Sequence, residues 1–133
     1  MNKVTILLLI ALVVILATCA VNAVRNNGFK TVSGEEFATL IANTPSLQLV
    51  DVRTPEEFAE GHLAGAQLIN VKDSTFLEQA TKQLSKKKPV AVYCRSGKRS
   101  ASAAGKLVKA GYQVINLDGG IIAWKEENRP IEQ

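Results

Sequence analysis

The chemistry of this chain is concentrated in the stretch YCRSGKRSASAAG, residues 93–105. Cys94 directly follows the apolar run PVAVY, and a basic loop comes after it. A cysteine thiolate is a strong nucleophile, and nearby positive charge lowers the pKa of a thiol. The stretch therefore predicts an accessible, easily ionised nucleophile at Cys94, with positive charge supplied by Arg95, Lys98 and Arg99.

The residues after the cysteine also predict a backbone cradle for an anion. Gly97 allows a tight turn, and the small residues that follow favour a helix over 100–110. A helix N-terminus presents unpaired N–H groups and a partial positive charge, so the loop amides should converge on the sulfur. The alternative, a small buried cysteine that ends a strand, does not account for the basic loop.

The length of this loop limits the classes of reaction that Cys94 could catalyse. Arg99 follows Cys94 after four intervening residues, whereas cysteine-dependent phosphatases close a similar loop with five. A shorter loop makes a smaller cradle, which suits a sulfur atom carried on the thiolate better than a tetrahedral phosphate. A phosphatase or arsenate reductase remains a weaker alternative.

Strand and helix patterns alternate along the rest of the chain. The expected strands are 29–33, 47–53, 67–71, 89–94 and 112–117, and the expected helices follow Ser33, begin at Pro55, and cover 73–85, 100–110 and 121–127. Capping boxes are expected at Ser33 with Glu36 and at Thr54 with Glu57. Alternating strands and helices predict an α/β domain with a mostly parallel sheet and helices on both faces.

Three motifs in this order resemble the rhodanese sulfurtransferase family. They are LVDVRTPEEFAEGHLAGAQLIN at 49–70, CRSGKRS at 94–100 and NLDGGIIAW at 116–124. The resemblance covers about residues 30–130 and implies a three-layer fold with a five-stranded sheet. It implies no metal or organic cofactor.

The resemblance also implies a two-step reaction. Cys94 would take the outer sulfur of thiosulfate or a similar donor and pass it from a persulfide to a thiol or cyanide. The backbone N–H groups from Arg95 through Ser96, Gly97 and Lys98 to Arg99 would hold the persulfide, and the three basic side chains would attract the donor. Asp51 and Arg53 match D-x-R of the first motif and would orient loops, and His62 would be structural.

Composition limits the partners of the domain. The net charge of +4 comes from 16 basic and 12 acidic residues, and no basic stripe is interleaved with aromatics, so nucleic acid is not expected. The two cysteines are Cys19 and Cys94, and Cys19 lies in an apolar leader, so a disulfide framework is not expected. A redox protein or a sulfur-accepting protein could be a partner.

The first residues have the pattern of a targeting segment. A short positive start, an apolar run and small residues predict a signal peptide or an N-terminal membrane anchor over 1–23, with cleavage after Ala23 or Ala20. A lipoprotein signal at Cys19 is a third alternative. A linker over 24–29 and the domain over 30–133 would follow. Each alternative predicts an exported protein whose membrane contact, if any, is made by this segment.

Two further functions remain open from the sequence. The protein could relay persulfide sulfur to a partner with little turnover of thiosulfate, because Cys94 serves both reactions. It could also be an interaction module, although the cysteine and its basic loop argue against that function.

Overall fold

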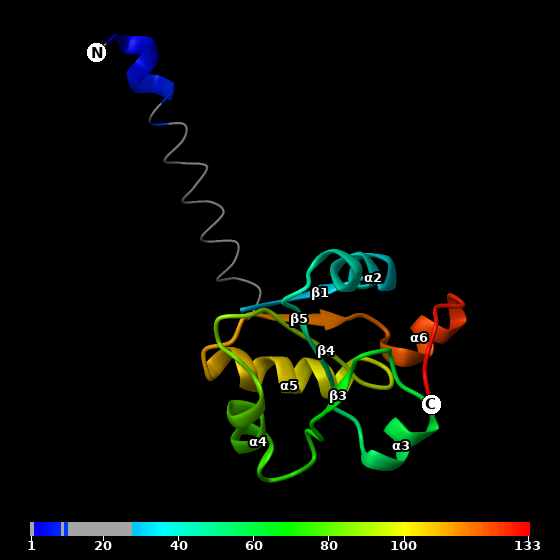
Figure 1. Cartoon of the computed structure of the whole chain (residues 1–133). Helices are drawn as coiled ribbons and strands as arrows, with labels where there is room; N and C mark the ends of the chain where they lie inside the picture. Colours follow the sequence, from blue (N-terminus) through cyan, green and yellow to red (C-terminus); the bar gives the residue numbers. More distant parts are fainter. Residues whose placement is uncertain (1, 9, 11–27) are drawn as a thin grey trace.

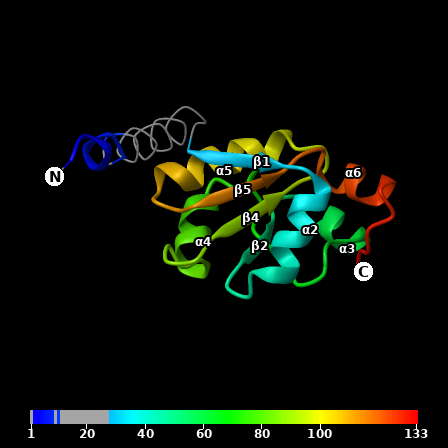
Figure 2. The same cartoon turned by 90° about the horizontal axis from the view of Figure 1, so that it is seen from above.

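The computed structural model describes residues 2–8, 10 and 28–133 (Figure 1). Five parallel strands form one sheet in the order β1-β5-β4-β2-β3, with β4 at its centre. Figure 2 shows β1, β5, β4 and β2 side by side in this order. The strands are β1 (Phe29–Val32), β2 (Gln48–Asp51), β3 (Gln67–Leu68), β4 (Val90–Tyr93) and β5 (Val114–Leu117).

Helices cover both faces of this sheet. They are α2 (Gly34–Asn43), α3 (Pro55–Glu60), α4 (Phe76–Gln83), α5 (Lys98–Lys109) and α6 (Gly120–Glu126). Side chains of α4 and α5 share one apolar cluster with the sheet, and those of α2 and α6 share the other. Figure 1 shows α2 on the opposite side of the sheet from α4 and α5. The expected three-layer α/β fold with a parallel sheet is confirmed.

The central strand is buried on both faces, as its continuous apolar sequence predicts. All four residues of β4 are buried. Val90 and Val92 pack in the cluster under α4 and α5, while Ala91 and Tyr93 pack in the cluster under α2 and α6. The residue after β4 is Cys94, so the most deeply buried strand carries the candidate nucleophile to the carboxyl edge of the sheet.

The starts of several helices differ from expectation, and α4 begins at Phe76, three residues later than expected. Ser33 caps α2 by accepting a hydrogen bond from the backbone N–H of Glu36, but the return bond of a capping box is absent there. Thr54 has the complete box with Glu57. Helix α5 begins at Lys98, two residues earlier than expected, because Gly97 takes the N-cap position with φ of 105°.

Most of the leader lies outside the described residues, including the proposed cleavage sites and Cys19. Among the residues that are described, no helix is long and apolar enough to cross a membrane. Of the expected linker, Gly28 precedes the sheet and Phe29 already belongs to β1.

Candidate active site

The thiol of Cys94 lies where the central strand ends and the loop into α5 begins. Its Sγ accepts a hydrogen bond from the backbone N–H of Gly97 at 3.1 Å. The turn requires a φ of 105° at Gly97. Glycine adopts this angle readily, whereas residues with a side chain rarely do. The loop therefore turns back on the sulfur, as expected for a backbone cradle.

Opposing effects act on the pKa of this thiol. Burial raises the pKa of Cys94, but hydrogen bonds from the hydroxyl and N–H of Ser100 and from the N–H groups of Gly97 and Ser96 outweigh it. The net result is a pKa below the ordinary cysteine value. These donors stabilise the negative charge of a thiolate, which is the form that attacks sulfur.

The role of Ser100 was not expected from the sequence. Its side chain is fully buried, and its hydroxyl donates to the carbonyl of Gly97 at 3.1 Å. The hydroxyl has one proton, so it serves either that carbonyl or the thiolate. Its position one residue beyond Arg99, in the first turn of α5, was the available signal.

The expectation of an accessible thiol is wrong for this structure. Cys94 is 1% exposed and belongs to the apolar cluster under α4 and α5. The physical reason is that Cys94 packs into this cluster at the end of β4, while the loop turns back so that the amide of Gly97 contacts its sulfur. The neighbouring Arg95, Ser96 and Lys98 are exposed.

The start of α6 holds the loop from its other side. The N–H groups of Ile121 and Ile122 donate to the carbonyls of Cys94 and Arg95 at 2.9 and 3.1 Å. Gly120, with φ of 59°, packs directly against these carbonyls, and a Cβ there would collide with the carbonyl of Arg95. Gly120 of the third motif is therefore required by this close approach, a role that the sequence reasoning missed.

The guanidinium of Arg99 is already paired with a carboxylate. Its Nη1 and Nη2 donate to Oε1 and Oε2 of Glu57 at 2.7 and 2.8 Å. The hydrogen bonds from Arg99 are the main cause that lowers the pKa of Glu57 to about 2, and the same pair raises the pKa of Arg99. The attraction of a donor by Arg99 thus stays a prediction, with its charge already compensated.

The sequence matches the model of the rhodanese-like domain over residues 33–127. The chain belongs to the rhodanese-like domain family. A sulfurtransferase of Allochromatium vinosum is 38% identical over 106 residues, which cover 75% of this chain and 92% of that protein. A thiosulfate sulfurtransferase of Tolumonas auensis is 36% identical over 98 residues, which cover 73% of this chain and 89% of that protein.

Solved structures of rhodanese-like proteins have the same fold. The crystal structure of a rhodanese-like domain protein from Staphylococcus aureus superposes with a TM-score of 0.66 at 30% identity. The match covers 78% of this chain and 99% of that one. The resemblance inferred from the three motifs is thereby confirmed at the level of the family and the fold.

A second ion pair lies deeper in this rhodanese-like domain. Arg53 donates from Nη2 to Oδ2 of Asp51 at 2.7 Å and from Nη2 to the carbonyl of Gly61, also at 2.7 Å. Burial acts to lower the pKa of Arg53, but its bonds to Asp51 outweigh burial and raise it. The pair therefore ties the end of β2 to the turn after α3, and its effect on catalysis stays a prediction.

The histidine of the first motif has structural partners. The Nδ1 of His62 lies 3.0 Å from the carbonyl of Phe58, and its ring stacks on that of Phe58 with centroids 3.8 Å apart. Its backbone pairs with that of Glu132. A carbonyl can only accept, so Nδ1 carries the proton in this contact.

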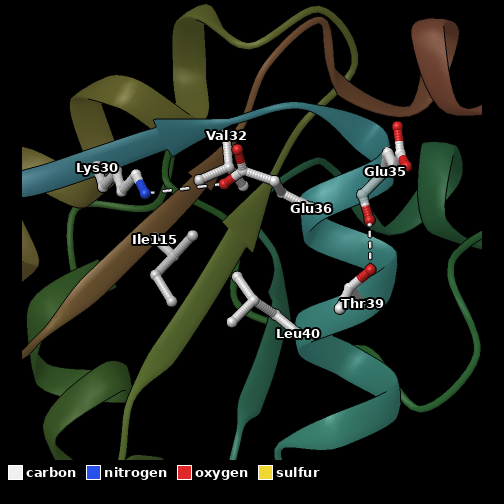
Figure 3. Close-up of a pocket in the computed structure, with 7 residues that line it drawn as sticks. All are labelled: Lys30, Val32, Glu35, Glu36, Thr39, Leu40 and Ile115. Atoms are coloured by element: carbon white, nitrogen blue, oxygen red, sulfur yellow. Dashed lines mark hydrogen bonds and ion pairs between the residues drawn. The ribbon is translucent and has the colours of Figure 1, made fainter.

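One hollow of about 400 Å³ lies away from the thiol, on the α2 face (Figure 3). None of its lining residues belongs to the Cys94 loop. Lys30 and Glu36 face each other across it at 3.7 Å, and Val32, Leu40 and Ile115 supply apolar surface. No cluster of three or more His, Cys, Asp or Glu side chains able to hold a metal occurs in the described part of the chain.

Proposed function

We propose that this protein is a sulfurtransferase that carries sulfane sulfur as a persulfide on Cys94. The observation that carries the proposal is the sulfur of Cys94 accepting the amide of Gly97 at the N-terminus of α5, with a lowered pKa. The sulfurtransferase names of the family members in Allochromatium vinosum and Tolumonas auensis support it.

In the first step, the Cys94 thiolate attacks the outer sulfur of thiosulfate. The new S–S bond forms to Cys94, the old S–S bond breaks, and sulfite leaves with the electron pair. In the second step, cyanide or a thiolate attacks the terminal sulfur, and the Cys94 thiolate leaves. The products are thiocyanate or a new persulfide, and no external oxidant or reductant is required.

The loop has separate parts for the persulfide and for the donor. The amides from Arg95 to Arg99, including those of Ser96 and Gly97, hold negative charge on sulfur. Arg95 and Lys98 are exposed and form no ion pair with another described residue, so they attract the donor anion. Asp51 and Arg53 orient the turn after α3 from the end of β2.

Intact-protein mass spectrometry after incubation with thiosulfate, and again after cyanide, tests this function. We expect Cys94 to gain one sulfur atom and to lose it as thiocyanate forms. Cys94→Ser should gain no sulfur while its thermal unfolding midpoint stays close to that of the wild type. Sulfur transfer by Cys94→Ser, or no gain on demonstrably reduced Cys94, would refute the proposal.

The same samples separate an enzyme from a sulfur relay. An enzyme should turn over many thiosulfate molecules with cyanide or a small thiol as acceptor. A relay protein should accept one sulfur and release it efficiently only to a partner protein.

We also propose that residues 1–23 direct the domain out of the cytoplasm. The apolar leader with its positive start supports export. Cell fractionation, with sequencing of the mature N-terminus, distinguishes cleavage after Ala20 or Ala23 from a retained anchor or a lipid on Cys19. Recovery of the full-length chain in the cytoplasm would contradict export.

A further inference from the structure

The pair between Glu57 and Arg99 has an unusual place for a surface ion pair. It joins the first turn of α3 to the first turn of α5, and only about a quarter of each side chain is exposed. Both terminal nitrogens of the guanidinium are engaged, each by a different carboxylate oxygen. This two-point geometry is the one an arginine would use to grip a tetrahedral oxyanion.

Glu57 is itself held in place by the cap of its own helix. Oε1 of Glu57 accepts hydrogen bonds from the backbone N–H of Thr54 at 3.4 Å and from its hydroxyl at 3.1 Å. The N–H of Glu57 donates to the same hydroxyl at 3.3 Å. An incoming anion would have to displace a carboxylate that is already oriented toward Arg99, and it would also disturb the cap.

We propose that Glu57 is a specificity-determining residue of the Cys94 site, which occupies the guanidinium of Arg99 and so weakens the binding of tetrahedral oxyanions. Its consequence for catalysis rests on the proposed sulfurtransferase function. The sulfonate end of thiosulfate has the oxyanion shape that Arg99 would otherwise bind. Its three basic side chains alone would suggest a preference for oxyanion donors. With Arg99 occupied, the site should instead favour donors without the sulfonate group, such as the persulfides of small thiols.

Sulfate protection of Cys94 against iodoacetamide tests this inference without requiring sulfur transfer. Sulfate is the probe because it has the relevant shape and cannot react with the thiol. In Glu57→Gln the guanidinium loses its charged partner, so we expect half-protection at about fivefold lower sulfate concentration than in the wild type. Rates are compared at matched thiolate fraction, taken from the pH dependence of alkylation in each variant.

Glu56→Gln is the matched control. Glu56 precedes Glu57 on α3 and is exposed, so its replacement makes the same change in net charge without touching Arg99. Its half-protection concentration should stay within about twofold of the wild type, as expected for a screened surface charge. The double variant Glu57→Gln with Arg99→Gln should lose the gain, because the gain acts through Arg99.

A second variant keeps the test informative if Glu57→Gln folds poorly. Glu57→Asp retains the charge but shortens the side chain by one methylene, so it should hold Arg99 less well and show a smaller gain in sulfate affinity. Equal half-protection in Glu57→Gln and Glu56→Gln, no sulfate protection in either, or a gain that persists without Arg99 would overturn the inference.

The donor preference gives an independent measurement. If sulfur transfer occurs, Glu57→Gln should lower the KM for thiosulfate more than the KM for glutathione persulfide, with little change in kcat. Absence of a persulfide on Cys94 would refute the proposed function alone, because the alkylation assay would still measure the anion site.

Discussion

Two ion pairs of this domain both use residues of the first motif but have different surroundings. Asp51 and Arg53 are two residues apart, and their side chains are 0% and 5% exposed. Glu57 and Arg99 are 42 residues apart, and their side chains are 25% and 24% exposed. The first pair closes a local structure at the end of β2, whereas the second connects two helices beside the thiol.

This difference separates a structural pair from one that can influence chemistry. The Asp51–Arg53 pair also bonds the backbone of Arg53 and the carbonyl of Gly61, so its loss would leave several buried groups unpaired. The Glu57–Arg99 pair has solvent available to both partners, so its loss should cost less stability. Its effect should appear mainly in what the Cys94 loop binds.

Breaking the buried pair should have the largest effect on stability. Asp51→Asn leaves the charge of Arg53 buried without a partner, so we expect a loss of about 3–5 kcal/mol in the free energy of unfolding. Chemical denaturation measures it, with the exposed Asp118→Asn as the control. A loss below that of Glu57→Gln would contradict the contrast between the pairs.

Gly120→Ala should have the next largest effect. This variant tests whether backbone contacts or the Glu57–Arg99 pair hold the Cys94 loop. The added Cβ meets the carbonyl of Arg95, which cannot move without shifting the loop. We expect destabilisation by about 1–3 kcal/mol and a higher pKa for Cys94. Gly105→Ala, which has open space at its Cβ, is the control. An unchanged alkylation profile would show that this contact does not position the loop.

Ser100→Ala should act on the thiol with a smaller effect on stability. It removes the hydroxyl that can donate to the thiolate of Cys94 in place of the Gly97 carbonyl, so the midpoint of alkylation against pH should rise. The expected shift is about one pH unit or less, the size of one hydrogen bond to a charged group. The exposed Ser102→Ala on the same helix should leave the midpoint unchanged.

Loss of the Glu57–Arg99 contribution in acid should be the smallest of these effects on stability. The folded pKa of Glu57, about 2, lies below its ordinary value of 4.5. The stabilisation is therefore complete above pH 4.5 and is lost as the pH falls toward 2. The difference in stability between wild type and Glu57→Gln should shrink over this window, and a constant difference would contradict the assignment.

The order of elements could be predicted because its signals are local. Thr54 and Pro55 mark the start of α3, and the uninterrupted apolar run into Cys94 marks a strand covered on both faces. The family motifs located the thiol and its loop for the same reason. Each of these features depends on only a few consecutive residues.

The contacts that refine the site were not predictable in this way. Glu57 completes the cap of α3 and reaches across 42 residues to Arg99, and only the first of these roles has a local sequence signal. The approach of Gly120 to the Cys94 loop depends on where α6 begins after β5, at the carboxyl edge of the sheet. The burial of Cys94 likewise follows from how the loop closes over its own sulfur.

The burial of Cys94 has a consequence for how sulfur could leave the protein. A cysteine residue that is 1% exposed cannot meet a second folded protein in disulfide geometry while its loop stays closed. If Cys94 carries sulfane sulfur as proposed, the persulfide lengthens its side chain by one S–S bond of about 2 Å, and the outer sulfur becomes the atom that an acceptor must reach. The resting thiol is thus sheltered from cross-linking, and under the proposed mechanism an acceptor would need to contact only the outer sulfur and not Sγ itself.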